Sequence, residues 1–133
     1  MNASMQAVMT ECSRGSDENR LSFPDVVAKL SAIGVERYHA DLARAEKTFY
    51  MPDGASFVIA SKPVAGIAAR DFSVEGVLAA VKAIQRREID YAEFCRRIVA
   101  SGCVEYTVSL AGRRAIYNGR SGDLHIERFP ANA

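Results

Sequence analysis

The spacing of apolar residues switches between the helical period of about 3.6 and the strand period of two along the first half of this chain. Ser22 can cap a helix that ends at Gly34, and an earlier helix should stop near Gly15. Further along, Asp53-Gly54 suits the tight turn of a hairpin. The pattern therefore predicts two helices and then three strands, over residues 2–13, 22–34, 37–42, 47–51 and 55–59.

The second half of the chain predicts the same order of elements. Ser73 begins a helix with an apolar stripe, and Asp90 begins another. Three strands follow, with Asn118-Gly119 expected as the turn between the last two. The connection between the halves is apolar enough to pack down on the core. These helices, strands and the connection cover residues 74–84, 90–102, 103–110, 113–117, 123–129 and 61–72.

Residues 21–59 align without a gap on residues 89–127 when the chain is shifted by 68 positions. Six of the 39 pairs are identical, and Gly34 pairs with Gly102. Many other pairs keep a physical role as caps, aromatic residues, acids, bases or aliphatic residues. We therefore predict one domain of two pseudo-equivalent α-α-β-β-β repeats, with the domain spanning residues 1–133 and the repeats about residues 2–60 and 73–129.

The predicted fold class is α+β. Three strands and two helices bury too little surface on their own, so we expect the two strand triplets to share one antiparallel sheet with the helices packed on one face. A pseudo-twofold arrangement of this kind creates a groove on its axis, lined by equivalent positions of both repeats. That groove is the first place to look for a site.

Composition and charge narrow the classes of partner. The chain holds 17 basic and 16 acidic residues, so its net charge of +1 gives no global field that would attract nucleic acid or an anionic membrane. No apolar stretch approaches the roughly 20 residues that span a bilayer. The first residues lack the pattern of a secretion signal. We therefore expect a soluble cytoplasmic protein without a membrane partner.

The polar side of the first predicted strand differs chemically from its counterpart in the second half. If the two strands are neighbours, a histidine, carboxylates, hydroxyls and an arginine share one surface. An imidazole oriented by a carboxylate is a general-base arrangement, and a serine or threonine could be its nucleophile. The alternative is the solvent face of a sheet, where alternation requires polar residues. The candidate binding residues on this surface are Arg37, His39, Asp41, Glu105, Thr107 and Ser109.

The sequence favours neither a metal nor a cofactor. Zinc needs three or four ligands at compact spacing, whereas the only histidines, His39 and His125, are far apart and the three cysteines are dispersed. Cys95 and Cys103 lie 68 positions after Val27 and Val35, so we expect both thiols in the core. Pairs of arginines among acidic residues fit solvated helix faces better than a nucleic-acid surface.

Three stretches of the chain carry a family resemblance that spans nearly its whole length: SRGSDENRLSFPDVVAKLSAIGVERYHADLARAEKTFYMPDG, AIQRREIDYAEFCRRIVASGC and VSLAGRRAIYNGRSGD. They resemble an uncharacterised bacterial family whose members carry a domain-of-unknown-function label and are sometimes named phage envelope protein. The resemblance implies a small soluble protein with a prophage association. It supplies no catalytic residues.

Three hypotheses for function remain open from the sequence. The first is a non-enzymatic binding or interaction protein, in which a sheet edge or the groove between the repeats receives a peptide, a protein or a small ligand. The second is a small enzyme that uses His39 with Asp41 or Glu105. The third is a nucleic-acid binder that uses the arginine pairs. Self-association as a homodimer through free sheet edges is compatible with all three.

Overall fold

The computed structural model describes residues 1–130 of the chain, and it has two helices followed by three strands in each half. The first half consists of α1 (Ala3–Asp17), α2 (Phe23–Ala32), β1 (Arg37–Asp41), β2 (Glu46–Tyr50) and β3 (Ser56–Ala60). The second consists of α3 (Val74–Gln85), α4 (Tyr91–Ala100), β4 (Cys103–Ser109), β5 (Arg114–Gly119) and β6 (Leu124–Arg128).

Side-chain caps begin the helices where the sequence predicts them. Ser22 and Asp25 form a reciprocal capping box at the start of α2, and Asp90 accepts a hydrogen bond from the backbone N–H of Glu93 at the start of α4. The expected stop of α1 near Gly15 is displaced, because the helix continues to Asp17. Gly15 instead provides space, since a Cβ there would lie 2.5 Å from Leu21 Cδ1.

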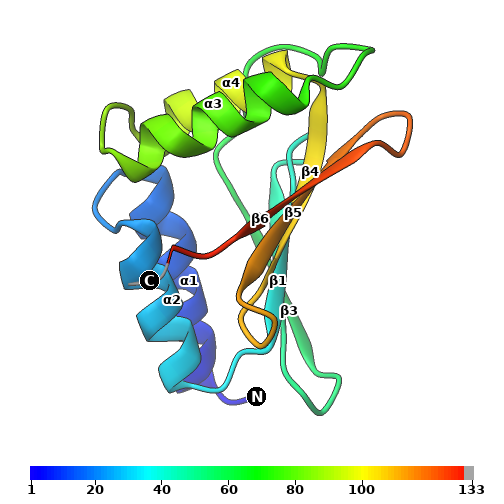
Figure 1. The fold of residues 1–133 in the computed structure, drawn as a ribbon. Helices are drawn as coiled ribbons and strands as arrows, with labels where there is room; N and C mark the ends of the chain where they lie inside the picture. Colours follow the sequence, from blue (N-terminus) through cyan, green and yellow to red (C-terminus); the bar gives the residue numbers. More distant parts are fainter. Residues whose placement is uncertain (131–133) are drawn as a thin grey trace.

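All six strands join one antiparallel sheet in the order β3-β2-β1-β4-β5-β6. The four helices cover a single face of this sheet, with α1 beside α2 and α3 beside α4 (Figure 1). The α+β class, the shared sheet and the one-sided helical layer are therefore confirmed.

The backbone has a twofold character centred on the β1–β4 pair. His39 lies opposite Thr107 in this antiparallel pair, and these residues are 68 positions apart. Residues in the left-handed region also occur in pairs 68 positions apart. The duplication of the sequence stays a prediction, but these pairs show that the two halves take the same backbone path at Asn19 and Arg87, Gly34 and Gly102, Ala45 and Arg113, and Gly54 and Gly122.

The expected turn at Asn118-Gly119 is wrong. Both residues belong to β5, and the chain turns over residues 120–123, where Gly122 has a φ of 88°. Gly119 is required by packing instead, because a Cβ there would lie 2.8 Å from Cδ1 of Phe72. Asn118-Gly119 therefore forms part of a strand rather than a turn, although its sequence favours a turn, because Gly119 packs against Phe72.

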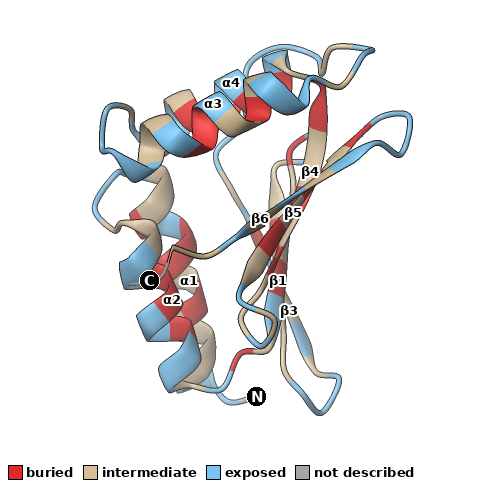
Figure 2. Ribbon diagram, viewed as in Figure 1, coloured by how far each residue is buried: buried red, intermediate tan, exposed pale blue. Residues whose placement is uncertain are grey.

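The core fills the space between the helices and the inward face of the sheet (Figure 2). Cys12, Cys95 and Cys103 are free and buried in it, as predicted for the last two. The connection of residues 61–72 packs Val64, Ala68 and Phe72 against this core, which agrees with its apolar composition.

Candidate functional site

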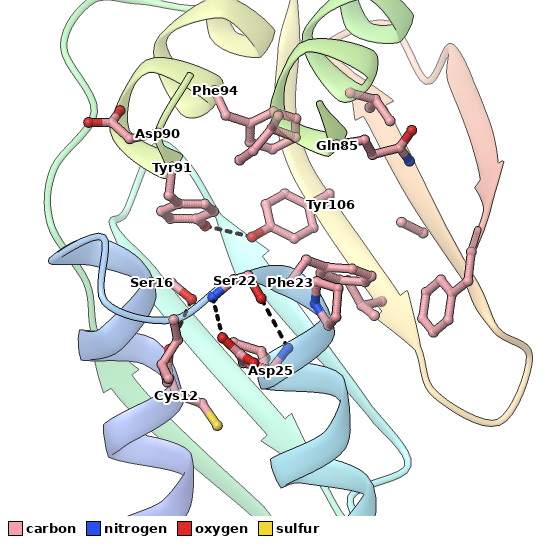
Figure 3. Close-up of a pocket in the computed structure, with 18 of the residues that line it drawn as sticks. Cys12, Ser16, Ser22, Phe23, Asp25, Gln85, Asp90, Tyr91, Phe94 and Tyr106 are labelled. Carbon is pink, nitrogen blue, oxygen red and sulfur yellow. Dashed lines mark hydrogen bonds between the residues drawn. The ribbon is translucent and has the colours of Figure 1, made fainter. Parts of the chain in front are cut away.

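A cavity of about 940 Å³ lies between the two helix pairs and the inward face of the sheet. Its walls come from the end of α1, the start of α2, the end of α3 and the start of α4. Strands β1, β2, β4 and β5 form its floor, and residues 127–130 close one side. Figure 3 shows lining residues from all four helices and from β4. We call this cavity the groove.

The lining of the groove is built largely from positions 68 apart. Tyr38 and Tyr106 form one such pair on the floor, and Ser22 and Asp90 form another at the rim. Eleven pairs of this kind account for 22 of the 31 lining residues. The groove thus lies on the twofold axis of the backbone, where the predicted repeat puts it.

Aromatic side chains form the floor of the groove. Tyr38 lies between Phe49, with ring centroids 5.3 Å apart, and Tyr106, with ring centroids 6.5 Å apart. Tyr117 follows Tyr106 at 5.6 Å. All four residues come from inward-facing strand positions. The floor is therefore a continuous ring-lined surface, which suits an apolar or aromatic ligand.

Two hydroxyl groups meet in the wall of the groove. Tyr91, from the first turn of α4, and Tyr106, from β4, have their hydroxyl oxygens 2.5 Å apart (Figure 3). Burial raises the pKa of both phenols well above the ordinary value. Both therefore stay protonated, and each phenol has one donor proton for use within the pair or toward a ligand.

Lys47 brings an amine to the floor of the groove, and sequence analysis missed it. Lys47 is 4% exposed. Its Nζ lies 3.3 Å from Asp17 Oδ1 and 4.6 Å from the centre of the Tyr91 ring. Burial lowers the pKa of Lys47, whereas Asp17 acts in the opposite direction. The signal that could have found it is the register of β2, in which Lys47 shares the inward side with Phe49.

Ser13 adds an unsatisfied polar atom to the lining. Its residue is 2% exposed, and its Oγ has no hydrogen-bond partner among the described residues. An unpaired buried hydroxyl costs roughly 1–3 kcal/mol. The residues that line the groove therefore include a buried hydroxyl, an amine and two phenols.

The structure places the six residues predicted as a site on the other side of the sheet. All six point away from the helices, and none of them lines the groove. His39 Nε2 and Glu105 Oε2 are 3.0 Å apart, so β1 and β4 do bring an imidazole to a carboxylate. The outward positions at the β1–β4 interface are Arg37, His39, Asp41, Glu105, Thr107 and Ser109.

Two of these six residues have local structural partners. Asp41 Oδ1 accepts hydrogen bonds from the backbone N–H groups of Ala43 and Arg44, and Ser109 Oγ accepts one from the backbone N–H of Gly112. These bonds hold the turns that follow β1 and β4. A role of the six residues in binding or catalysis stays a prediction.

Comparison with known protein families gives one match, to the family model for "Protein of unknown function (DUF1398)", over residues 14–128. The chain belongs to this family. No curated protein matches the chain at a significant level. The family description assigns no activity, so the prophage association expected from the resemblance stays a prediction.

The family membership leaves function to the geometry of the site. Within residues 1–130, no group of three or more histidine, cysteine or acidic side chains is arranged to hold a metal ion. None of the described helices is long and apolar enough to cross a membrane. Two neighbouring arginines, Arg96 and Arg97, both contact Glu93, which lowers the pKa of that carboxyl to about 2. Glu93 therefore offsets one of the two guanidinium charges within the helix.

Proposed function

We propose that this protein is a non-enzymatic binding protein that holds a small organic ligand in the groove. The observation that carries the proposal is the cavity itself. Its volume of about 940 Å³ lies within the range of roughly 300–1,000 Å³ typical of small-molecule sites. Such sites combine an apolar lining with polar groups. The groove has an aromatic floor, and its lining also holds four basic and four acidic side chains.

The chemistry of the lining indicates the kind of ligand. Aromatic rings on the floor favour an apolar or aromatic body. Lys47 and the hydroxyl groups of Tyr91 and Tyr106 favour a hydrogen-bond acceptor or an acid group on the same ligand. We therefore expect a small aromatic or aliphatic acid to bind better than a cation of equal size.

The test uses 8-anilinonaphthalene-1-sulfonate, an aromatic anion whose fluorescence rises in apolar sites. We expect saturable binding of one dye per chain. Ala115→Phe adds a ring to the groove floor, where Ala115 is buried, and should weaken binding by about tenfold or more because the two rings compete for space. Lys47→Met keeps the length of the side chain and should weaken binding by about tenfold through loss of the charge-assisted contact.

Leu124→Ser is the matched control, because Leu124 is an exposed apolar residue on the outward side of the sheet. It should leave the dissociation constant unchanged. Far-UV circular dichroism establishes that each variant is folded. Dye binding that Ala115→Phe leaves intact, or that Leu124→Ser abolishes, would place the dye outside the groove and contradict the proposal.

A further inference from the structure

The outward face of the sheet is open, since all four described helices lie on its other side (Figure 1). The strand register divides this face into three rows of six positions that run across the strands. The central row contains His39 and Thr107. We call the flanking rows the basic row, which contains Arg37, and the acidic row, which contains Asp41.

The two flanking rows carry opposite charge. Three arginines occupy the basic row, one each on β1, β5 and β6, and three carboxylates occupy the acidic row, one each on β2, β1 and β4. Each row is about 7 Å from the central row, because two residues of a strand span that distance. The charged members are Arg37, Arg114 and Arg128 in the basic row, and Glu46, Asp41 and Glu105 in the acidic row.

The separation of charge follows from differences between the two halves of the chain. Arg37 lies 68 positions before Glu105, and Glu46 lies 68 positions before Arg114, so equivalent positions carry opposite charges. Two identical halves would have placed like charges in both rows. A strict repeat could not have placed opposite charges on the two rows, so the charge separation depends on the differences between the halves.

Exposed apolar side chains lie among the charges. Val58, Leu124 and Ile126 are 52%, 50% and 46% exposed, and all three point outward from the edge regions of the sheet. They are three of the five large hydrophobic residues that are exposed within residues 1–130. Exposed apolar side chains at both ends of an open face are typical of a surface that binds another protein.

We propose that the outward face binds the outward face of a second copy of this chain, through a twofold axis parallel to the rows. This axis reverses the strand direction of the partner, so the basic row of each copy lies over the acidic row of the other. The central rows then cover each other, so Val58 and Ile126 meet their own copies, whereas Leu124 lies over the partner's Arg128. A twofold axis along the strands would instead place the two basic rows together.

A second copy fits the face better than an unrelated protein because the face is complementary to itself. An isologous interface uses the same patch on both subunits. Here Arg37 lies over the partner's Asp41, and Arg114 and Glu46 each lie one strand from a partner charge of opposite sign. The three rows of six give 18 outward positions on each copy, close to the 20–30 residues per side of a standard interface. Complementary charges select the orientation as well as the partner.

The existing contacts of the charged residues allow this arrangement. Arg37 lies over the Tyr50 ring at 3.9 Å and 3.5 Å from Glu36, and its side chain is still 45% exposed. The Glu105 side chain is 43% exposed although it contacts His39. Both side chains therefore present charge to a partner without leaving their own sheet.

The test exchanges charge between two variants. One carries Arg37→Glu and Arg114→Glu, which makes its basic row acidic. The other carries Glu46→Lys and Glu105→Lys, which makes its acidic row basic. Sedimentation velocity over a concentration series measures association of the wild type, of each variant and of their mixture. Lys82→Glu with Arg86→Glu, at exposed positions at the C-terminal end of α3, is a control with the same change in net charge as the first variant.

The wild type and the control should form dimers, and each row variant alone should dissociate with a Kd raised by about 100-fold because like rows then face each other. The equimolar mixture should recover the wild-type Kd, since opposite rows meet again on both sides of the axis. This recovery also shows that the variants are folded. A monomeric wild type, row variants that still dimerise, or a mixture that stays monomeric would each overturn the proposal.

Discussion

At the scale of single residues, Lys47 is the side chain that departs most from its surroundings. The alternation of β2 turns it inward beside Phe49, and its residue is almost completely buried. A buried ion pair such as that between Lys47 and Asp17 is a weak source of stability, because desolvation offsets the attraction. An apolar residue would stabilise this position as well or better. This agrees with the role in ligand binding that we propose for Lys47.

The buried thiols should make the free energy of unfolding fall at alkaline pH. Burial raises the pKa of Cys103 from its ordinary value of 9.0 to about 12. Below pH 9 the stability linked to this thiol is fully present. Above pH 9 the unfolded chain releases the thiol proton and the folded chain keeps it, so the free energy of unfolding falls until about pH 12. One thiol contributes a slope of up to about 1.4 kcal/mol per pH unit.

Urea unfolding between pH 8 and pH 11, with a reducing agent present, measures this slope. Cys103→Ala should flatten it relative to the wild type. Val35→Ala, at the buried position 68 residues earlier, removes side-chain volume without a titrating group and should leave the slope unchanged. Equal slopes in the wild type and Cys103→Ala would show that the thiol does not titrate differently in the two states.

At the scale of elements, local chemistry predicts most of the fold. Caps at Ser22, Ser73 and Asp90 and the glycine after α4 place the helices within a residue or two. The two errors, at Gly15 and Gly119, have one physical cause. The local pattern predicts a helix stop at Gly15 and a turn at Gly119. Each glycine instead makes room for a side chain, which is Leu21 for Gly15 and Phe72 for Gly119. Such contacts are not encoded in the local pattern.

The candidate site was less predictable than the fold for a related reason. Alternation separates the two sides of β2, but it does not say that the inward side carries a cavity. The polar residues of β1 are predicted as a site because they differ chemically from their counterparts in β4. They lie on the opposite side of the sheet from the groove. The repeat predicts a groove on the twofold axis, but the volume of the groove depends on the distance between the helix pairs, which no sequence pattern in this chain reports.

The glycines that end α2 and α4 provide a test of structural equivalence. Gly34 and Gly102 both have positive φ, at 82° and 95°. A Cβ on Gly34 would meet only Met51 Cε at 3.8 Å, whereas a Cβ on Gly102 would lie 2.6 Å from the backbone oxygen of Asp71. Gly34→Ala should therefore cost about 1 kcal/mol of stability from backbone strain. Gly102→Ala should cost about 1–3 kcal/mol more, because the connection must also move.

Chemical denaturation of both variants measures the two costs under the same conditions. Equal destabilisation would mean that the connection near Asp71 yields without cost. That result would contradict the close packing of the connection on the second half, which also rests on the hydrogen bond from Ser73 N–H to the carbonyl of Ser101.

At the scale of the whole molecule, one sheet separates two surfaces of different chemistry. Successive residues of a strand point to opposite faces, so Lys47 lines the groove while Glu46 and Thr48 lie on the open face. The inward face is aromatic and enclosed by helices. The outward face is charged in ordered rows. One strand therefore supplies a proposed ligand site and a proposed dimer interface without sharing a side chain between them.

This separation predicts that the two proposed interactions are independent. The variant with Arg37→Glu and Arg114→Glu should bind the sulfonate dye with a Kd within about twofold of the wild type although it no longer dimerises, because neither substituted residue lines the groove. Ala115→Phe should lose dye binding and still dimerise. Dye titration and sedimentation velocity on both variants give four measurements. Loss of dye binding in the folded monomeric variant would instead mean that dimerisation shapes the groove, because contact with a second copy would then determine how far the sheet floor lies from the helices.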